Sequence, residues 1–396
     1  MTAAMAGTAT AEPAKRAKCP EALREHFLLD DHVVFLNHGS YGASPRPVWE
    51  TYTGWQRQLE RQPVEFFRRH ESLLASARTS LAAMVNVQPD DLSFVVNATS
   101  GINVIARSFP LAPGDEILST DLEYGALGYT WEHLCQRFGA TYVRAEIALP
   151  FTTHEAVVEA LWSRVTDRTK AIYLSHITSG TAAILPVEEI CRRARQAGIL
   201  TIVDGAHAPG QIPLDLTGMD VDIYSGNCHK WLCAPKGSAF LYVHPVQQEW
   251  IESLTISWGW RPDNTFLSRN QQQGTRDISS FLAVPRAIEF QREHDWEAVR
   301  ASCHERLKDF RQDMHDRYGV EPVYPNTGEW FGQMALVEIP PIDLATLGQA
   351  LLLTHNIEIP CMKHAETTCV RVSVQGYVSV EDLGALSNAI ESIVGC

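Results

Sequence analysis

The stretch that decides the fold is Thr201-Ile-Val-Asp-Gly-Ala-His207, followed downstream by Tyr224-Ser-Gly-Asn-Cys-His-Lys-Trp231. In the first segment an apolar run ends in a single acid, Asp204. This pattern is typical of a buried strand whose carboxylate emerges at the strand tip, where open α/β sheets bind ligands. The second segment continues an apolar run into a polar cluster that ends in Lys230, and the adjacent Trp231 suits a desolvated amine. An acid thus follows one predicted strand and a lysine follows another.

An acid and a lysine in these two places are what pyridoxal phosphate (PLP) requires. The lysine forms a Schiff base with the cofactor, and the acid keeps the pyridine nitrogen protonated so that the ring can accept electrons. Either residue alone is more commonly a solvated lysine or a helix-capping aspartate. Together, Asp204 and Lys230 predict the catalytic residues of a PLP-dependent enzyme.

Two motifs carry a resemblance to a known family. Asp-Gly-Ala-His-Ala-Pro-Gly (204–210) and His-Lys-Trp-Leu-Cys-Ala-Pro-Lys-Gly (229–237) resemble the class V aminotransferase and cysteine desulfurase superfamily, a branch of the fold-type I PLP enzymes. Within this branch the chain is most similar to the isopenicillin N epimerase-like group, over nearly everything from Val33 to Ile393. The resemblance implies pyridoxal 5′-phosphate as cofactor and a small-molecule amino acid as substrate, whereas the reactions of the group vary.

Composition limits the other possibilities. A chain of 396 residues with 45% hydrophobic residues can bury a large core and is expected to form two domains. The net charge of −14 argues against nucleic-acid binding, which needs a basic face. Nine cysteines without C-x-x-C spacing indicate reduced intracellular thiols, and neither a disulfide framework nor a metal site is expected.

The hydropathy of the sequence bears on the cellular location of the protein and on its N-terminal segment. No apolar run approaches the ~20 residues of a membrane span, so no membrane partner and a cytoplasmic location are expected. Residues 1–20 are rich in Ala and Thr and lack an apolar signal core, which predicts a disordered tail. A transit peptide is the less favoured interpretation of this segment.

Strands alternate with helical patterns from about residue 90 to 245, which predicts an α/β fold with a mostly parallel sheet. The resemblance implies a fold-type I large domain with a seven-stranded type of sheet. We expect a large PLP-binding domain over residues 21–285, whose first segment, 21–60, contributes to the small domain or to a dimer contact. Residues 286–396 are expected to form a smaller α+β domain.

Several residues are expected at the phosphate of the cofactor. Thr99 and Ser100 open a helix after a predicted strand, and unpaired N–H groups at a helix start bind anions. The superfamily holds the phosphate with a Ser and a His just before the lysine, and these positions are Asn227 and His229 here. Thr275 lies in a segment that resembles a turn reaching the phosphate of the neighbouring subunit. This implies a homodimer with a shared active site.

Other residues are expected at the ring and the substrate. Tyr124 matches the family aromatic that stacks on the pyridine ring, Thr178 the polar group beside its phenolic oxygen, and His207 a further ring contact. The segment Asn37-His-Gly-Ser-Tyr-Gly42 matches the one that lines the substrate side, which implies substrate-binding roles for Asn37, His38 and Tyr41. Arg371 matches the arginine that binds the substrate α-carboxylate, for which a planar bidentate fork is suited.

Epimerisation or racemisation at Cα is the leading reaction. Lys230 would remove the Cα proton, and a second acid would return a proton from the other face. His38, Tyr41 and Cys228 are the candidates for that acid, and the sequence does not choose among them.

Carbon–sulfur bond cleavage is the main alternative. A cysteine desulfurase needs a nucleophilic thiol on a mobile loop before Arg371, and the thiols there are Cys361 and Cys369. The short segment 357–371 disfavours such a loop, but a lyase that releases its sulfur product directly needs no thiol. Aminotransfer and decarboxylation are weaker alternatives, and a non-catalytic binding protein is disfavoured because Asp204, Lys230 and Arg371 are all present.

Overall fold

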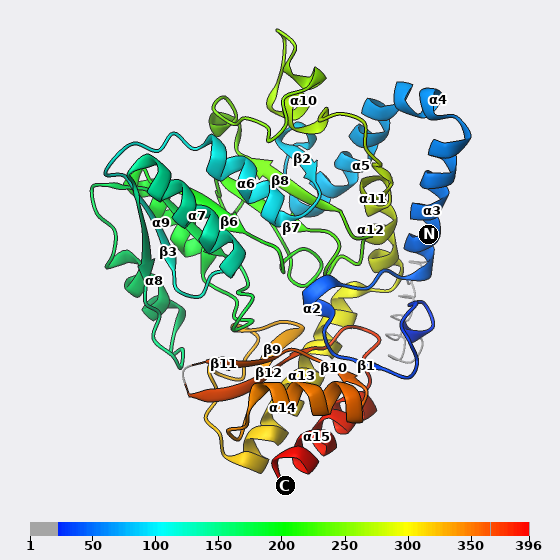
Figure 1. Ribbon diagram of the computed structural model, residues 1–396, viewed down its shortest axis with the longest axis vertical. Coiled ribbons are helices and arrows are strands. Elements are labelled where there is room, and N and C mark those ends of the chain that lie inside the picture. Colours follow the sequence, from blue (N-terminus) through cyan, green and yellow to red (C-terminus); the bar gives the residue numbers. More distant parts are fainter. Residues whose placement is uncertain (1–22, 365, 396) are drawn as a thin grey trace, which may run out of the picture.

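The computed structural model describes residues 23–364 and 366–395, so the predicted disordered tail over residues 1–20 lies outside the described residues. A seven-stranded sheet with the order β2-β8-β7-β6-β5-β3-β4 forms its centre (Figure 1). Only β8 runs antiparallel to its neighbours in this sheet, which confirms the predicted mostly parallel α/β fold. The strands are β2 (Leu92–Val95), β3 (Glu116–Thr120), β4 (Thr141–Ala145), β5 (Thr169–Ser175), β6 (Leu200–Asp204), β7 (Ile223–Asn227) and β8 (Ala239–Val243).

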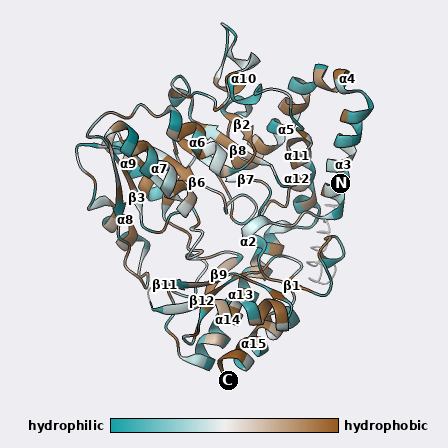
Figure 2. Ribbon diagram, viewed as in Figure 1, coloured by the Kyte–Doolittle hydropathy of each residue, from teal (hydrophilic) through white to brown (hydrophobic). Residues whose placement is uncertain are grey.

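Both faces of the large sheet are buried, which explains why its strands are nearly continuous apolar runs. In β5, Ala171 and Tyr173 belong to one hydrophobic core, and Ile172 and Leu174 belong to the other. All four side chains are fully buried. Figure 2 shows hydrophobic colouring on the central strands and more hydrophilic colouring on outer helices such as α3.

Helices cover the two faces of this sheet. The helices α6 and α7 contribute to the core that contains Tyr173, and α8 and α9 contribute to the opposite core. The helices up to residue 318 are α2 (His38–Tyr41), α3 (Arg46–Arg61), α4 (Pro63–Arg68), α5 (His70–Val85), α6 (Ala98–Ser108), α7 (Gly125–Phe138), α8 (His154–Trp162), α9 (Val187–Ala197), α10 (Phe266–Gln271), α11 (Ser279–Leu282), α12 (Val284–Glu293) and α13 (Trp296–Tyr318). Within the described ranges, no helix is both long and apolar enough to cross a membrane.

A smaller α+β unit follows the long helix α13. Its antiparallel sheet has the order β11-β12-β9, and a separate parallel pair joins β1 to β10. The N-terminal strand therefore pairs with a strand more than 300 residues away in sequence, as the blue and orange ribbons in Figure 1 show. These elements are β1 (Val34–Phe35), β9 (Met334–Ile339), β10 (Ile357–Glu358), β11 (Cys361–His364), β12 (Thr367–Ser373), α14 (Leu344–Gln349), a π-helical turn (Ala350–Thr354) and α15 (Val380–Val394).

The register of the large sheet brings three polar residues to one edge. Ser175 pairs with Asp204 across β5 and β6, and Asp204 pairs with Ser225 across β6 and β7. Directly paired residues project to the same face of a sheet. The carboxyl ends of these parallel strands therefore present their side chains to one space, at the edge where α/β sheets bind ligands.

Candidate active site

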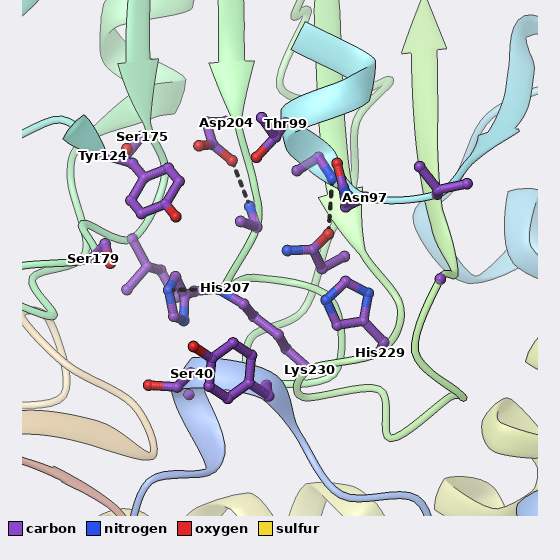
Figure 3. A pocket seen from close by; sticks show the side chains of 18 of the residues that line it. Ser40, Asn97, Thr99, Tyr124, Ser175, Ser179, Asp204, His207, His229 and Lys230 are labelled. Atoms are coloured by element: carbon purple, nitrogen blue, oxygen red, sulfur yellow. Dashed lines mark hydrogen bonds between the residues drawn. The ribbon is translucent and has the colours of Figure 1, made fainter. Parts of the chain in front are cut away.

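A cavity of about 500 Å³ lies at this edge of the large sheet. Figure 3 shows the side chains of Asp204, His207 and Lys230 turned toward the same space. Strand β12 of the smaller unit contributes Arg371 to the wall. The lining residues are Gly39, Ser40, Tyr41, Val96, Asn97, Ala98, Thr99, Tyr124, Ser175, Ile177, Ser179, Asp204, Ala206, His207, Asn227, His229, Lys230, Gly237 and Arg371.

The amine of Lys230 is held inside the cavity without a carboxylate partner among the described residues. Its Nζ lies 3.0 Å from Nε2 of His207. Burial lowers the pKa of Lys230 to about 8, the negative charge of Asp204 opposes this shift, and the positive charge of Arg371 adds to it. At pH 7 roughly a tenth of this amine is therefore uncharged, the form that a nucleophile or a base requires.

Asp204 is buried at the tip of β6. Its Oδ1 accepts a hydrogen bond of 2.9 Å from the backbone N–H of Ala206. Burial raises the pKa of Asp204 to about 6, while this hydrogen bond and the charge of Lys230 favour the carboxylate. A carboxylate in such a dry site can hold a proton on a nearby ring nitrogen, because the two opposite charges then compensate each other.

The N-terminus of α6 lines one end of the cavity. Asn97 caps the helix by accepting a hydrogen bond of 2.7 Å from the backbone N–H of Ser100. Thr99 lines the cavity in the first turn, and Oδ1 of Asn227 accepts a hydrogen bond of 2.8 Å from the backbone N–H of Ala98. The positive end of the helix dipole favours a bound phosphate here.

Arg371 reaches the cavity from β12. Its Nη2 donates to Oγ of Ser40 at 3.1 Å, and its Nη1 donates to the backbone carbonyl of Ser179. Its Nε is buried and has no hydrogen-bond partner in the part of the chain that the structure describes. Burial lowers the pKa of Arg371 to about 10, so the guanidinium remains charged at neutral pH. A buried cation with an unused donor is suited to bind a carboxylate.

Two of the residues expected at the substrate are turned away from the cavity. Nδ2 of Asn37 donates to Oε1 of Glu358 at 3.0 Å and so ties α2 to β10. The ring of His38 is fully buried, 3.0 Å from both the carbonyl oxygen of Lys230 and the hydroxyl of Tyr377. Burial lowers the pKa of His38 to about 3. The side chain of His38 thus supports the turn that carries Lys230, and that of Asn37 supports strand β10 of the β1–β10 pair. Tyr41 lines the cavity as expected.

Three residues expected at the cofactor also lie outside the cavity wall of this chain. The hydroxyl of Thr178 is buried and lies 2.5 Å from the hydroxyl of Thr181 within its own turn. Ser100 follows Thr99 but does not line the cavity, and Thr275 is exposed at the surface. The irregular turn after β5 has no fixed period, so a gapless match could not tell which of its side chains faces inward.

Sequence reasoning missed Ser175 and Glu123. Ser175 lines the cavity and donates to Oε2 of Glu123 at 2.6 Å, and Thr120 donates to Oε1 of the same carboxyl at 2.6 Å. Burial raises the pKa of Glu123 to about 7, and the charge of Asp204 adds to this shift. The aligned tips of β5 and β6 could have indicated Ser175, but Glu123 lies in a loop with no such signal.

The comparisons with known proteins agree with this geometry. A family model described as aminotransferase class-V matches residues 47–386. The chain belongs to the aminotransferase class-V family. Isopenicillin N epimerase of Streptomyces clavuligerus is 35% identical over 392 residues, which cover 95% of this chain and 98% of that protein. This class-V protein is therefore an enzyme, and its cofactor is pyridoxal 5′-phosphate.

Other similar proteins carry names of sulfur chemistry. The putative L-cysteine desulfhydrase 1 of Oryza sativa subsp. japonica is 27% identical over 416 residues, which cover 91% of this chain and 83% of that protein. A solved structure of a C-DES variant, with glycine covalently linked to its PLP cofactor, has a TM-score of 0.79 at 21% identity. It covers 91% of this chain and 97% of its own, and the similarity shows the shared fold.

The residues around the cavity fit PLP. The start of α6 offers a site for the phosphate, Asp204 offers a partner for the ring nitrogen, and Lys230 offers an amine for the aldehyde. The guanidinium of Arg371 lines the same cavity and offers a cation for the carboxylate of an amino acid. The donor and acceptor set of this class-V enzyme thus matches the chemical groups of the cofactor and of an amino-acid substrate.

Proposed function

We propose that this enzyme catalyses epimerisation or racemisation at Cα of an amino acid, in the manner of isopenicillin N epimerase. The observation that carries the proposal is the set of groups in one cavity: the amine of Lys230, the guanidinium of Arg371 and the hydroxyl of Tyr41. No cysteine lines this cavity in the part of the chain that the structure describes. These groups suit proton removal and return better than sulfur transfer.

In this proposal each residue has one task. PLP, when bound, supplies an electron-accepting ring that weakens the bonds at Cα of a linked amino acid. Arg371 binds the α-carboxylate and so fixes which bond at Cα is presented to the ring. Lys230 removes the Cα proton, since its pKa of about 8 allows the uncharged amine near neutral pH. Asp204 stabilises the protonated ring nitrogen.

A second acid must return a proton to the opposite side of Cα. Of the three candidates from the sequence, His38 and Cys228 are fully buried and lie outside the cavity wall. Burial lowers the pKa of His38 and raises the pKa of Cys228, so each stays neutral. Tyr41 lines the cavity and is 72% exposed, which leaves its hydroxyl free to exchange protons with solvent. We therefore assign the second proton transfer to Tyr41.

Carbon–sulfur cleavage is the alternative function, because relatives named L-cysteine desulfhydrase share about a quarter of their residues with this chain. A persulfide-forming mechanism is disfavoured by the position of Cys361. This residue begins β11, pairs with Val370 of β12 and lies outside the cavity wall. Burial raises the pKa of the Cys361 thiol to about 11, which suppresses the thiolate that a nucleophile needs. A lyase that releases its sulfur product directly is compatible with the cavity.

Incubation in D2O with isopenicillin N, and separately with single amino acids, tests the proposal. Deuterium at Cα with loss of optical purity and no released product supports epimerisation. Sulfide from cysteine would favour the lyase, and keto acid or carbon dioxide would favour transamination or decarboxylation. Tyr41→Phe is expected to keep deuterium exchange of one enantiomer but to stop inversion. Unchanged inversion in that variant would remove Tyr41 from the mechanism.

We also propose that the enzyme works as a homodimer in which Thr275 donates to the phosphate held by the other subunit. The exposure of Thr275, together with the exposed ring of Tyr124 at the cavity, supports a second chain nearby. Sedimentation should then detect a dimer, and Thr275→Ala should weaken PLP binding without dissociating the dimer. A fully active monomer would refute the shared site.

A further inference from the structure

Three side chains, two of which line the cavity, form a hydrogen-bonded line. The indole Nε1–H of Trp231 donates to Nδ1 of His207 at 3.4 Å, and Nε2 of the same imidazole lies 3.0 Å from Nζ of Lys230. Trp231 is fully buried and His207 is 2% exposed, so both rings are shielded from bulk solvent. Each nitrogen of this histidine therefore has one protein partner.

The chemistry of the partners determines where the imidazole proton lies. An indole N–H can only donate, so Nδ1 of His207 must accept with its lone pair and carries no hydrogen. The single proton of a neutral imidazole is then on Nε2. An Nε2–H group facing Nζ makes a hydrogen bond only if the amine of Lys230 accepts it, and only an uncharged amine has a lone pair to do so.

The opposite arrangement would be a Lys230 ammonium that donates to Nε2, with the imidazole proton on Nδ1. That proton would then point at the indole N–H of Trp231, and two donors would face each other in a dry site. Losing a buried hydrogen bond in this way costs roughly a tenfold change in equilibrium or more. The two charged groups near the amine have opposite effects on its pKa, since Asp204 favours the ammonium and Arg371 disfavours it.

We propose that Trp231 is a positioning residue whose indole N–H selects the Nε2–H tautomer of His207, so that His207 donates to Lys230 and favours the uncharged form of its amine. Burial above all, with the positive charge of Arg371, holds the pKa of His207 well below its usual value, which excludes the doubly protonated ring. An uncharged amine is the form that can condense with the cofactor aldehyde. The inference rests on the proposed role of Lys230.

The main chain keeps the three side chains in register. The carbonyl of Lys230 lies 3.0 Å from a ring nitrogen of His38 and accepts a hydrogen bond of 3.0 Å from the backbone N–H of Cys233. Gln291 donates to the carbonyl of Trp231 at 2.8 Å, and Gln211 donates to the carbonyl of His207 at 2.8 Å. A turn that is fixed at both ends can direct two successive side chains, Lys230 and Trp231, onto one imidazole.

The tautomer can be measured on the full-length protein without cofactor or substrate, by ¹⁵N NMR of protein with labelled histidine. Since the chain has 15 histidines, His207→Gln identifies the signal by its loss. In the wild type, Nδ1 of His207 should have the shift of an unprotonated ring nitrogen and Nε2 that of a protonated one. In Trp231→Phe, the protonated nitrogen should change from Nε2 toward Nδ1.

A second measurement reports on the protonation of the Lys230 amine. The pH midpoint for capture of PLP, measured by borohydride trapping, should rise by about one pKa unit in Trp231→Phe, because the ammonium regains an acceptor. Trp131→Phe is the matched control, since Trp131 is also fully buried but its Nε1 has no hydrogen-bond partner within the described residues. This control should leave both the tautomer and the midpoint unchanged.

Three results would overturn the inference: a wild-type His207 protonated on Nδ1, an unchanged tautomer in Trp231→Phe, or an unchanged midpoint in that variant. If Trp231→Phe does not fold, incorporation of a benzothienyl analogue at position 231 removes the N–H while keeping the shape of the ring. None of these measurements depends on which amino acid is the substrate. A failure of the epimerase proposal would therefore leave the test of Trp231 intact.

Discussion

Replacing Glu123 with glutamine should stabilise the protein increasingly as the pH rises from about 5 to about 8. The carboxyl of Glu123 accepts hydrogen bonds from Thr120 and Ser175, and burial raises its pKa from 4.5 to about 7. A carboxyl whose pKa is raised by folding contributes stability that is fully present below its unfolded pKa. That contribution is lost as the pH rises through the folded pKa, because the native state must then hold a disfavoured charge.

The size of the stability difference follows from the pKa shift of Glu123. A change from 4.5 to about 7 corresponds to at most ~3 kcal/mol of unfolding free energy. Because part of Glu123 is exposed to solvent, we expect about 1–2 kcal/mol. For a chain of this length each kcal/mol changes the melting temperature by roughly 1 °C. The melting temperature of Glu123→Gln should therefore gain about 1–2 °C on the wild type across this pH range.

Thermal unfolding of both proteins without cofactor, in a series of buffers, measures this difference. Glu116→Gln is a suitable control, because hydrogen bonds from Thr166 and Arg168 lower the pKa of Glu116. Glu116 is charged in both states above about pH 5, so its variant should lose stability by an amount that does not change with pH. A stability difference between Glu123→Gln and the wild type that does not change with pH, or a loss of stability at high pH, would refute a partly buried carboxyl whose pKa is raised.

Three further predictions concern the site. Gly42→Ala should destabilise the enzyme by more than ~1 kcal/mol in denaturant unfolding, since φ is +70° there and a Cβ would lie 2.0 Å from the carbonyl oxygen of His229. The control Gly54→Ala, at a position in α3 where a Cβ meets open space, should instead stabilise it. Equal effects of the two substitutions would contradict backbone strain at Gly42. Asp204→Asn should retain PLP in absorbance spectra but lose ~3 kcal/mol or more of barrier lowering in the Cα exchange assay, so a near wild-type rate would exclude it as the partner of the ring nitrogen. Cys361→Ala should leave activity largely intact, and abolished sulfide release with PLP still bound would instead establish a desulfurase.

The sequence by itself determined the fold class and the chemical centre of the site. Apolar runs that end in polar residues predicted the parallel strands, because a strand buried on both faces must be apolar along its length. Asp204 and Lys230 follow two such runs, and this order along the chain is enough to mark both as groups at strand ends. Arg371 and Tyr124 came from the family resemblance, and both line the cavity.

Only the tertiary structure decided which side chains of the irregular segments face the cavity. Asn37 and Thr178 lie in irregular segments and His38 begins the four-residue helix α2, which is too short for a period to fix the side-chain direction. Each of the three is instead bonded to neighbouring structure. The raised pKa of Glu123 likewise requires the enclosure that Ser175 and other distant segments provide. Side-chain direction in turns and the desolvation of charges both depend on what packs against a residue, and local sequence does not contain that information.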